Sequence, residues 1–426
     1  MNEFSTIDAC GSGMSARFGL YCRGLIVALF LLTALPNASA FSQKIDGVPD
    51  VSPGAVGSTD PIFYDSLSLG IRLIFYDQFE EALTLFEDLQ HSHPDHPAPH
   101  FFKAATYQAW MNSFRVSRFR EAFEENARLA ITKGKAWSKR DNNPWSYFYM
   151  GGAYGYQAVN RFRKRDWINA FIDAGSGVKS LEKALAIDPN LFDIYLGLGL
   201  YHYWRTAKSK FLRLITFWIP DNRELGLRQL EFAFEHGSCA SIEAGYGLVC
   251  TYFDYGRYEK AMSILNRLLE KKMTQGVSDL YYKGRLLIKF KKWPEAESVF
   301  REILARLENY KFTSVGYQVD CLYWLAEALT AQNIESEALV LTEKALARSE
   351  KRRADSEIEG PFENFKEIKM RLKRLHRSLM GNRTEISQYH SVKKKEDSVQ
   401  TNLTPFILWA PVDPRDVKPN SPKGLV

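Results

Sequence analysis

The sequence predicts an all-α protein made of stacked helix pairs, and three observations carry that prediction. Residues 238–305 contain one pattern twice, at an offset of 35 residues. Within each copy, apolar residues recur every three to four positions, which is the period of an amphipathic helix. Pro294 stands where the second helix of the later copy begins, a position at which its missing N–H costs little. One helix pair cannot bury its own apolar face, so the pairs must stack.

The repeated unit resembles the tetratricopeptide repeat (TPR), a helix–turn–helix unit of about 34 residues. The matching positions are Leu248, Tyr252, Gly256, Tyr258, Ala261, Leu265 and Leu268 in one copy, and Lys283, Leu287, Lys291, Trp293, Ala296, Phe300 and Ile303 in the next. The resemblance covers residues 61–352. It implies a TPR-like α-solenoid, a right-handed superhelix whose concave groove binds proteins or peptides, and it carries no catalytic residue.

The first residues have the features of a secretory signal peptide. Basic residues precede an apolar run, 24–35, which leads to an A-x-A motif at 38–40. The run is too short to span a bilayer, which takes about 20 residues. We therefore expect residues 1–40 to be cleaved on export to a bacterial periplasm and residues 41–60 to form a linker. The alternative is that the uncleaved segment anchors the protein in the inner membrane.

The remaining repeats follow the pattern with different fidelity. They are expected at 63–96, 98–138, 144–189, 195–237 and 319–352. The second of them fits the helical period but matches the small-residue positions poorly. The third and fourth contain basic, aromatic insertions at Arg161–Gly175 and Arg205–Asn222. Turns of consecutive repeats project from the same edge, so we expect these two segments to lie side by side as one lobe.

The composition of the two insertions suits peripheral contact with anionic lipid headgroups or with a partner protein. The alternative is a pair of longer helices whose aromatic residues pack on the neighbouring repeat.

Beyond the repeats, residues 353–380 are expected to form a capping helix, because a terminal repeat needs a cover with a polar outer face. Its apolar face is Phe365, Ile368, Leu372, Leu375 and Leu379. The alternative is a basic helix that lies on a membrane surface. Residues 381–426 have few apolar side chains and are expected to be disordered.

The motifs indicate a binding protein and not an enzyme. The net charge of +6 is modest for 426 residues, and we expect no nucleic-acid partner. The sequence has no metalloprotease, phosphate-loop or nucleophile-elbow motif, so we expect neither catalysis nor a cofactor. His91, His93, His96 and His100 have the chemistry of metal ligands. They connect two repeats, however, and we interpret them as an exposed loop without a metal ion. The three cysteines beyond residue 40 are expected in the core.

In the TPR family the first helix of each repeat lines the concave groove, so aromatic residues there are the expected binding surface. One column of such positions reads Leu67, Phe148, Leu196, Tyr246, Tyr281 and Tyr323. Aromatic and Arg side chains carry most interface energy. We therefore predict partner-binding residues at Phe148, Leu196, Tyr203, Tyr246, Phe253, Tyr281, Arg285 and Tyr323. The alternative is that these side chains only pack between repeats.

These observations together predict a protein-interaction scaffold of the bacterial cell envelope that holds a partner peptide or protein in its groove. The alternative is a periplasmic accessory protein of a transport system that binds a small molecule or lipid. An enclosed apolar cavity in place of an open groove would favour that alternative.

Overall fold

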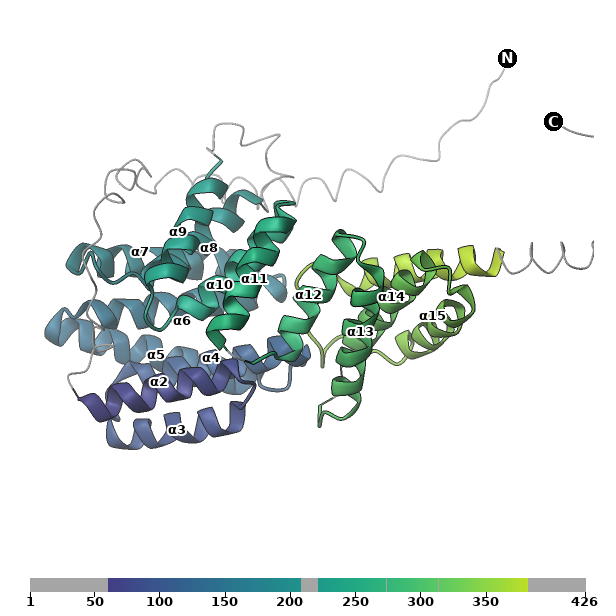
Figure 1. Ribbon diagram of the computed structural model, residues 1–426. Coiled ribbons are helices and arrows are strands. Elements are labelled where there is room, and N and C mark those ends of the chain that lie inside the picture. The colour runs from purple at the N-terminus through teal and green to yellow at the C-terminus, as the bar shows by residue number, and fades with distance from the viewer. Residues whose placement is uncertain (1–59, 208–220, 273, 313, 382–426) are drawn as a thin grey trace, which may run out of the picture.

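The computed structural model describes residues 60–207, 221–272, 274–312 and 314–381. Regular secondary structure within these ranges is α-helical, apart from an isolated bridge between Val116 and Glu357. The predicted signal peptide, nearly all of the linker and nearly all of the C-terminal tail lie outside the described residues. The predicted TPR-like α-solenoid is confirmed, because successive helices pair and the pairs stack (Figure 1).

Each pair has a first helix, with an even number, and a second helix, with an odd number. In chain order the pairs are α2 (Pro61–Phe75) with α3 (Phe79–Ser92), α4 (Pro97–Phe114) with α5 (Arg120–Asp141), α6 (Pro144–Arg163) with α7 (Trp167–Ile187), α8 (Ile194–Ala207) with α9 (Arg223–His236), α10 (Ser241–Asp254) with α11 (Tyr258–Lys272), α12 (Val277–Lys289) with α13 (Trp293–Glu308), and α14 (Val315–Ala331) with α15 (Glu335–Ser349). A further helix follows at 365–381.

The turn within a pair uses the left-handed backbone region. Five pairs place a residue with positive φ two positions before the second helix: Asp77 (59°), Arg165 (63°), Gly256 (79°), Lys291 (57°) and Asn333 (62°). A residue in this region ends the first helix and reverses the chain. Only one of the five is glycine, the residue that adopts this conformation without strain. The positive φ therefore occurs at a fixed position of the repeat, whichever residue type stands there.

Glycines bring the two helices of a pair close together. A Cβ on Gly177 of α7 would lie 3.0 Å from the carbonyl oxygen of Gly151 of α6. A Cβ on Gly226 of α9 would lie 2.6 Å from the carbonyl oxygen of Gly199 of α8. The small-residue positions of the repeat thus act as contacts between backbones, as the sequence pattern predicts.

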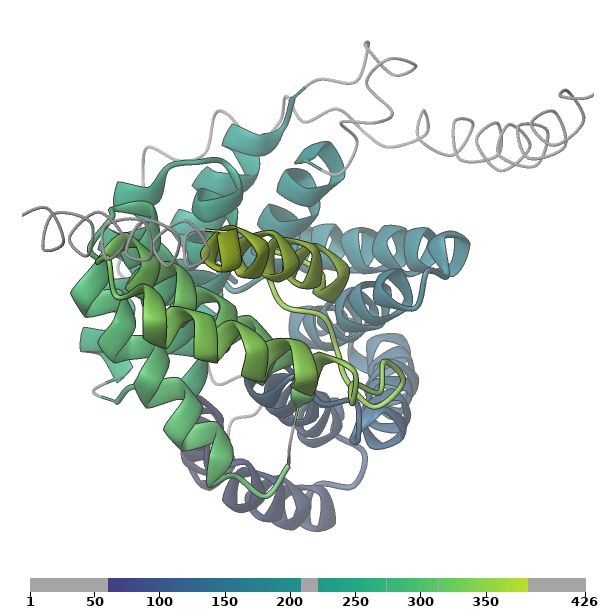
Figure 2. The same cartoon turned by 90° about the vertical axis from the view of Figure 1, so that its right-hand side faces the viewer.

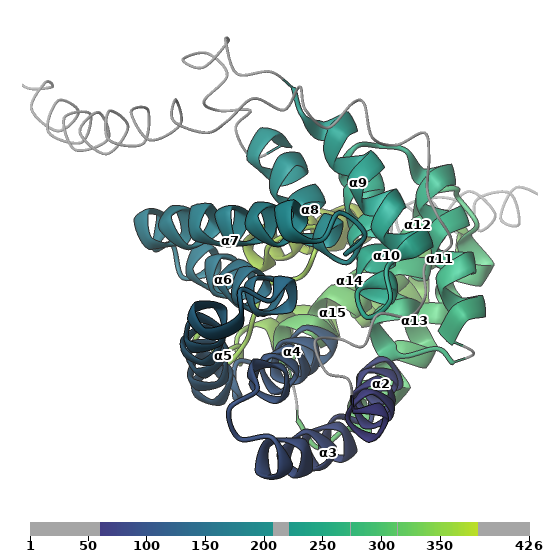
Figure 3. The same cartoon turned by 90° about the vertical axis from the view of Figure 1, so that its left-hand side faces the viewer.

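The stacked pairs wind around an axis until the chain meets itself. Figure 3 shows the first helices from α2 to α12 arranged around this axis, with α14 and α15 beyond them. Where the turn closes, Tyr310 stacks on Phe114 with ring centroids 3.4 Å apart, and it accepts a hydrogen bond from the indole N–H of Trp110. Arg115, directly after α4, forms a buried ion pair with Asp320 of α14 at 2.6 Å. The superhelix is therefore locked by contacts between its early and late repeats.

Residues 353–364 contain no helix and line the concave side of the late repeats. The Glu357 carboxylate accepts hydrogen bonds from the N–H groups of Val315 and Gly316, at 2.8 Å each, and so caps the start of α14. Phe362 stacks on Phe253 of α10 with ring centroids 3.8 Å apart. The segment is thus held near its middle, at Glu357, and near its end, at Phe362.

The helix at 365–381 buries the apolar face that the sequence predicts for a capping helix (yellow-green in Figure 2). Ile368, Leu372 and Leu379 are buried, and Phe365 and Leu375 are partly buried. The cover of the last repeat therefore comprises a helix and, before it, the extended segment 353–364.

The predicted insertion Arg161–Gly175 is present as extra helix and not as a separate segment between the helices, because these residues prolong α6 and α7. The two helices have 20 and 21 residues, whereas α10 and α11 have 14 and 15. The extra length lies at the turn between the two helices. Gly151 of α6 and Gly284 of α12 both face the second helix of their own pair, and α6 continues for 12 residues after Gly151, whereas α12 continues for five after Gly284. The helices are longer, as in the alternative, but Phe162 and Trp167 are exposed and do not show the packing on a neighbouring repeat that the alternative included. The partner segment Arg205–Asn222 lies mostly outside the described residues, so its predicted place beside them stays a prediction.

Candidate functional site

The predicted groove residues lie on the first helices, but most of them are covered. Six of the eight are buried, namely Phe148, Tyr203, Phe253, Tyr281, Arg285 and Tyr323. Leu196 and Tyr246 are partly buried. The expectation of an exposed groove is therefore wrong for the six, because neighbouring repeats and residues 353–364 cover them. The binding of a partner by these residues stays a prediction.

Tyr281 and Arg285 belong to a buried network that holds residues 353–364 in place. Arg285 is fully buried and makes two hydrogen bonds to the Glu363 carboxylate, at 2.6 and 2.7 Å. Its guanidinium also lies 4.0 Å from the ring centroid of Trp324 and donates to the hydroxyl of Tyr281 at 2.9 Å. The Tyr281 hydroxyl in turn donates to Asp320 at 2.7 Å. The polar groups expected to meet a partner peptide thus meet the protein's own chain.

Tyr203 and Tyr323 are also satisfied internally. The Tyr203 hydroxyl is 2.8 Å from the carbonyl oxygen of Thr251 and 2.9 Å from the carboxylate of Asp254, in the next repeat. Tyr323 donates to Glu327 on its own helix. Burial raises the pKa of both tyrosines above its ordinary value, so both stay neutral. For these residues the structure has the alternative arrangement, in which rings pack within the fold.

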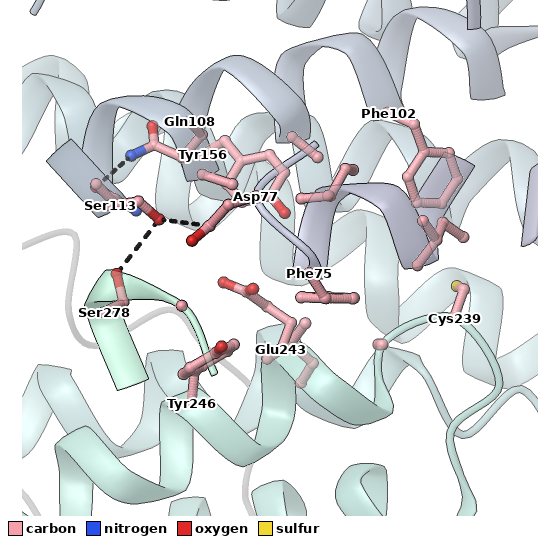
Figure 4. A pocket seen from close by; sticks show the side chains of 18 of the residues that line it. Phe75, Asp77, Phe102, Gln108, Ser113, Tyr156, Cys239, Glu243, Tyr246 and Ser278 are labelled. Atoms are coloured by element: carbon pink, nitrogen blue, oxygen red, sulfur yellow. Dashed lines mark hydrogen bonds between the residues drawn. The ribbon is translucent and has the colours of Figure 1, made fainter. Parts of the chain in front are cut away.

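A cavity of about 140 Å³ lies inside the ring of first helices (Figure 4). Helices α2, α4, α6, α8, α10 and α12 all contribute to its wall, and so do three of the predicted column residues. The apolar part of the wall consists of Ile71, Ile74, Phe75, Phe101, Phe102, Ala105, Ala109, Phe148 and Leu196. The concave side of this superhelix therefore contains a small axial cavity that is partly open to solvent.

One carboxylate of the cavity wall is neutralised within the protein. Asp279 is fully buried and pairs with Lys272 at 2.6 Å, and Tyr246 donates its hydroxyl to Asp279 at 2.7 Å. Lys272 also donates to the Tyr246 hydroxyl at 2.6 Å. The three groups satisfy one another, so they form a fixed polar patch on the wall.

Two further carboxyl groups, of Asp77 and Glu243, face the same space in Figure 4. Burial raises the pKa of Asp77 to about 6, against the opposing effect of Lys272. Burial alone raises the pKa of Glu243 to about 7. Glu243 makes no hydrogen bond or ion pair within the described part of the chain. The cavity therefore holds an acidic group with no partner of its own.

The sequence interpretation missed Asp77 and Glu243. Glu243 stands three residues before Tyr246 of the predicted column, so the two share a helix face and point to the same side. The sequence therefore did contain a signal for Glu243, because it places a charged residue among the apolar positions of the concave face. Asp77 gave no such signal, because its place in the turn between α2 and α3 suggests solvent exposure.

The prolonged turn end of α6 and α7 carries a second candidate surface, which we call the α6–α7 tip. It consists of Val159, Phe162, Trp167, Ile168 and Ile172, whose exposed fractions are 48, 42, 55, 69 and 51 %. The rings of Phe162 and Trp167 lie 4.6 Å apart and edge to face. Large apolar side chains gathered on a surface mark a site of association.

Two of the four basic residues around the α6–α7 tip are neutralised by carboxylates. Arg161 pairs with Asp173 at 2.6 Å, and Lys164 pairs with Glu124 of α5. Arg163 donates a hydrogen bond to Asn112 at 3.1 Å, towards the axis of the superhelix. Arg165 is exposed and has no ion pair among the described residues, so the tip combines an apolar surface with two cations that no carboxylate neutralises, Arg163 and Arg165.

The four clustered histidines are held apart by separate contacts. His96 caps the start of α4 and lies between the rings of Phe63 and Trp137, at 4.7 Å from each. His100 is buried, and its Nδ1 is 3.4 Å from the Asn126 side chain, so these two histidines do not lie in the exposed loop that the sequence predicts. The described residues contain no group of three or more potential ligand side chains suited to a metal ion.

The cysteines Cys239, Cys250 and Cys321 are free. Only Cys321 is fully buried, and Cys239 lies in the cavity wall. No described helix combines the length and the hydropathy needed to cross a membrane.

Comparison with known proteins adds loose structural likenesses. No family model matches the sequence, and no curated protein matches it. A thermophilic TPR protein of Thermus thermophilus superposes with a TM-score of 0.34 at 19% identity, over 53% of this chain and 96% of that one. A TPR repeat-containing protein of Cytophaga hutchinsonii superposes with a TM-score of 0.35 at 14% identity, over 68% of this chain and 97% of that one. Yeast Tom70 superposes with a TM-score of 0.36 at 15% identity, over 90% of this chain and 78% of that one. At these values we transfer no function and no residue role.

Proposed function

We propose that the protein is an interaction scaffold of the bacterial cell envelope, and that the α6–α7 tip is its contact with a partner protein. The observation that supports this proposal most directly is the exposure of Trp167 and Ile168, at 55 and 69 %. Burying such side chains contributes about 25 cal/mol for each Å² of apolar surface removed from water. A solenoid of helix pairs has no need of an exposed tryptophan at a turn for its own stability.

The charge of the tip favours a protein partner over a membrane. Binding to anionic lipid gains from free cations near the surface. Here two of the four cations, Arg161 and Lys164, are already paired with carboxylates, so only Arg163 and Arg165 could contribute. An apolar protein surface needs no such cations, so it is the occupant that the tip fits best.

The export of the protein is part of the proposal. It is supported by the apolar run and the A-x-A motif before residue 41. N-terminal sequencing of the protein purified from a periplasmic fraction should give Phe41 as the first residue. Retention of residues 1–40 in a membrane fraction would instead identify the inner-membrane anchor of the alternative.

The partner contact is tested with a tip variant, Trp167→Ser with Ile168→Ser, in the full chain. Cross-linking in envelope extracts should yield a partner that the variant loses, and binding should then be measured between the two purified proteins. Loss of a central aromatic anchor costs about 2–4 kcal/mol, or roughly 30- to 1,000-fold in affinity. Val340→Ser is the matched control, because Val340 is 60 % exposed and lies on α15, far along the chain from the tip.

Flotation with vesicles of phosphatidylglycerol and phosphatidylethanolamine separates a membrane contact from a protein contact. If the wild type floats at low salt and the tip variant does not, the tip is a lipid contact and the protein-partner proposal fails. Equal partner binding by wild type and tip variant would also overturn it. The axial cavity favours the second function considered from the sequence, the binding of a small molecule.

A further inference from the structure

The wall of the axial cavity contains three carboxylates and, among the described residues, no lysine, arginine or histidine. Asp279 has Lys272 as its counter-ion, from outside the wall. Asp77 accepts hydrogen bonds from the backbone of Val277 and, at 3.5 Å, from Ser113. Glu243 has neither a hydrogen bond nor an ion pair among the described residues. An ionised carboxylate in such a place needs a compensating positive charge, since removal from water is costly.

The rest of the wall suits an organic cation. The rings of Phe75, Phe101, Tyr156, Tyr246 and Tyr282 contribute to it. Aromatic faces attract cations that lie within about 6 Å of the ring centroid. An aromatic wall with one unpaired carboxylate favours an ammonium group and disfavours an anion.

The volume limits the size of the occupant. The cavity measures about 140 Å³. An engineered apolar cavity of roughly 150 Å³ holds one benzene molecule. The occupant therefore has about five or six non-hydrogen atoms inside the cavity, which fits a butylammonium or trimethylammonium-ethyl group. A metal ion is a poor fit, because the described residues offer no cluster of three ligands.

Two basic residues border the cavity without entering its wall. Lys272 of α11 is held by Asp279 and Tyr246. Arg163 of α6 is held by Asn112, whose side chain lies in the wall. Neither pairs with Glu243, so the charge that Glu243 needs is not supplied by them.

We propose that the axial cavity binds a small alkylammonium group, with Glu243 as its counter-ion and the surrounding aromatic rings as its walls. The ammonium group comes either from a free amine or from a lysine side chain of a partner. This site is separate from the α6–α7 tip, so the two proposals stand or fall independently.

Binding should strengthen as the pH rises from about 6 to 8, because ionisation of Glu243 follows its pKa of about 7. The titratable groups that interact with Glu243 are Tyr156, Tyr282 and Cys250, and burial raises the pKa of each of them. They stay neutral in this range. Asp77, with a pKa of about 6, ionises in the lower part of it and acts in the same direction.

Isothermal titration calorimetry on the full chain at pH 8 tests the proposal with choline, n-butylammonium and Nα-acetyl-lysinamide. The neutral isostere of choline, 3,3-dimethyl-1-butanol, is the ligand control. We expect at least one ammonium probe to bind tenfold or more tightly than the neutral isostere. Choline or n-butylammonium alone would identify a free amine, whereas Nα-acetyl-lysinamide would identify a lysine side chain.

Glu243→Gln keeps the shape of the side chain and removes its charge, and it should weaken ammonium binding tenfold or more. Glu270→Gln is the matched control, because Glu270 is an exposed carboxylate on α11 and should leave binding unchanged. Circular dichroism confirms that both variants fold. If Glu243→Gln fails to fold, Asp77→Asn provides the second test, with a smaller loss expected. The proposal is overturned if no ammonium probe binds at millimolar concentration, if the neutral isostere binds equally well, or if the folded Glu243→Gln variant binds as the wild type does.

Discussion

Removal of the Glu363 carboxylate should detach residues 353–364 from the concave side of the late repeats. In the folded protein Glu363 pairs with both terminal nitrogens of Arg285, whose side chain has no exposed surface. Glu363→Ala leaves this guanidinium buried without its carboxylate. Breaking a buried ion pair by removing one partner costs about 3–5 kcal/mol. Because Arg285 keeps its contacts with Tyr281 and Trp324, we expect the lower end, about 3 kcal/mol of the free energy of unfolding.

The assay is urea unfolding followed by circular dichroism, together with limited proteolysis. A loss of about 3 kcal/mol should shift the unfolding midpoint by roughly 1 M urea, for a slope of about 3 kcal/mol per M. Proteolysis should cut between residues 352 and 365 faster in the variant than in the wild type. Glu350→Ala is the control, because Glu350 pairs with Lys369 on the surface and its loss should leave the midpoint where it is. A midpoint shift equal to that of the control, or unchanged proteolysis, would refute the assigned role of the Arg285–Glu363 pair.

Three further predictions concern packing, turn strain and burial of charge. Gly226→Ala should lower the free energy of unfolding by about 3 kcal/mol in the same urea assay, because a Cβ there overpacks against the backbone of Gly199 and forces the helices apart. The control is Gly175→Ala, whose Cβ meets nothing within 4 Å. This change should be neutral or raise the free energy of unfolding by up to about 1 kcal/mol. Lys291→Gly should raise the unfolding free energy by about 0.5–1 kcal/mol, because its φ of 57° is strained for any residue with a Cβ, and a decrease would contradict the turn geometry. The folded pKa of Glu243, about 7, exceeds its ordinary value of 4.5, so the folded state binds the extra proton and stability falls as the pH rises between these values. Glu243→Gln should therefore raise the unfolding free energy by about 3 kcal/mol at pH 8 and change it little at pH 4, which thermal unfolding at the two pH values measures.

The fold was predictable because each helix pair is specified locally. The segment 238–305 contains the repeated unit twice, at an offset of 35 residues. Each copy has its own helical period, turn and small-residue contact. Local signals of this kind need no knowledge of distant parts of the chain. The same local character explains why degenerate repeats such as α4 with α5 were still recognisable as helix pairs.

The closure of the superhelix was not predictable from the same signals. The ion pair between Arg115 and Asp320 joins residues 205 positions apart. Its formation depends on small rotations that add up from one repeat to the next, and no single repeat encodes their sum. Arg115 in the sequence is only a basic residue at the end of a helix, and Asp320 is only one polar position on α14. The closure also brings Arg115 over the rings of Tyr281 and Tyr317, so it helps to bury one of the predicted groove residues, Tyr281.

Closure also explains why aromatic and charged residues occupy positions that an open groove would expose. The sequence predicts that Arg285 lies in a water-filled groove. In the structure its side chain is buried and pairs with Glu363. A buried pair of this kind is weak evidence for extra stability, because desolvation offsets most of its attraction. It does favour one position of residues 353–364 over others, since any slip would leave the charges unpaired. Residues 353–364 thus cover the concave side of the late repeats in a fixed register, and a cavity remains between the first helices α2 to α12. Glu243 in that cavity is the carboxylate for which the described part of the chain supplies no such partner.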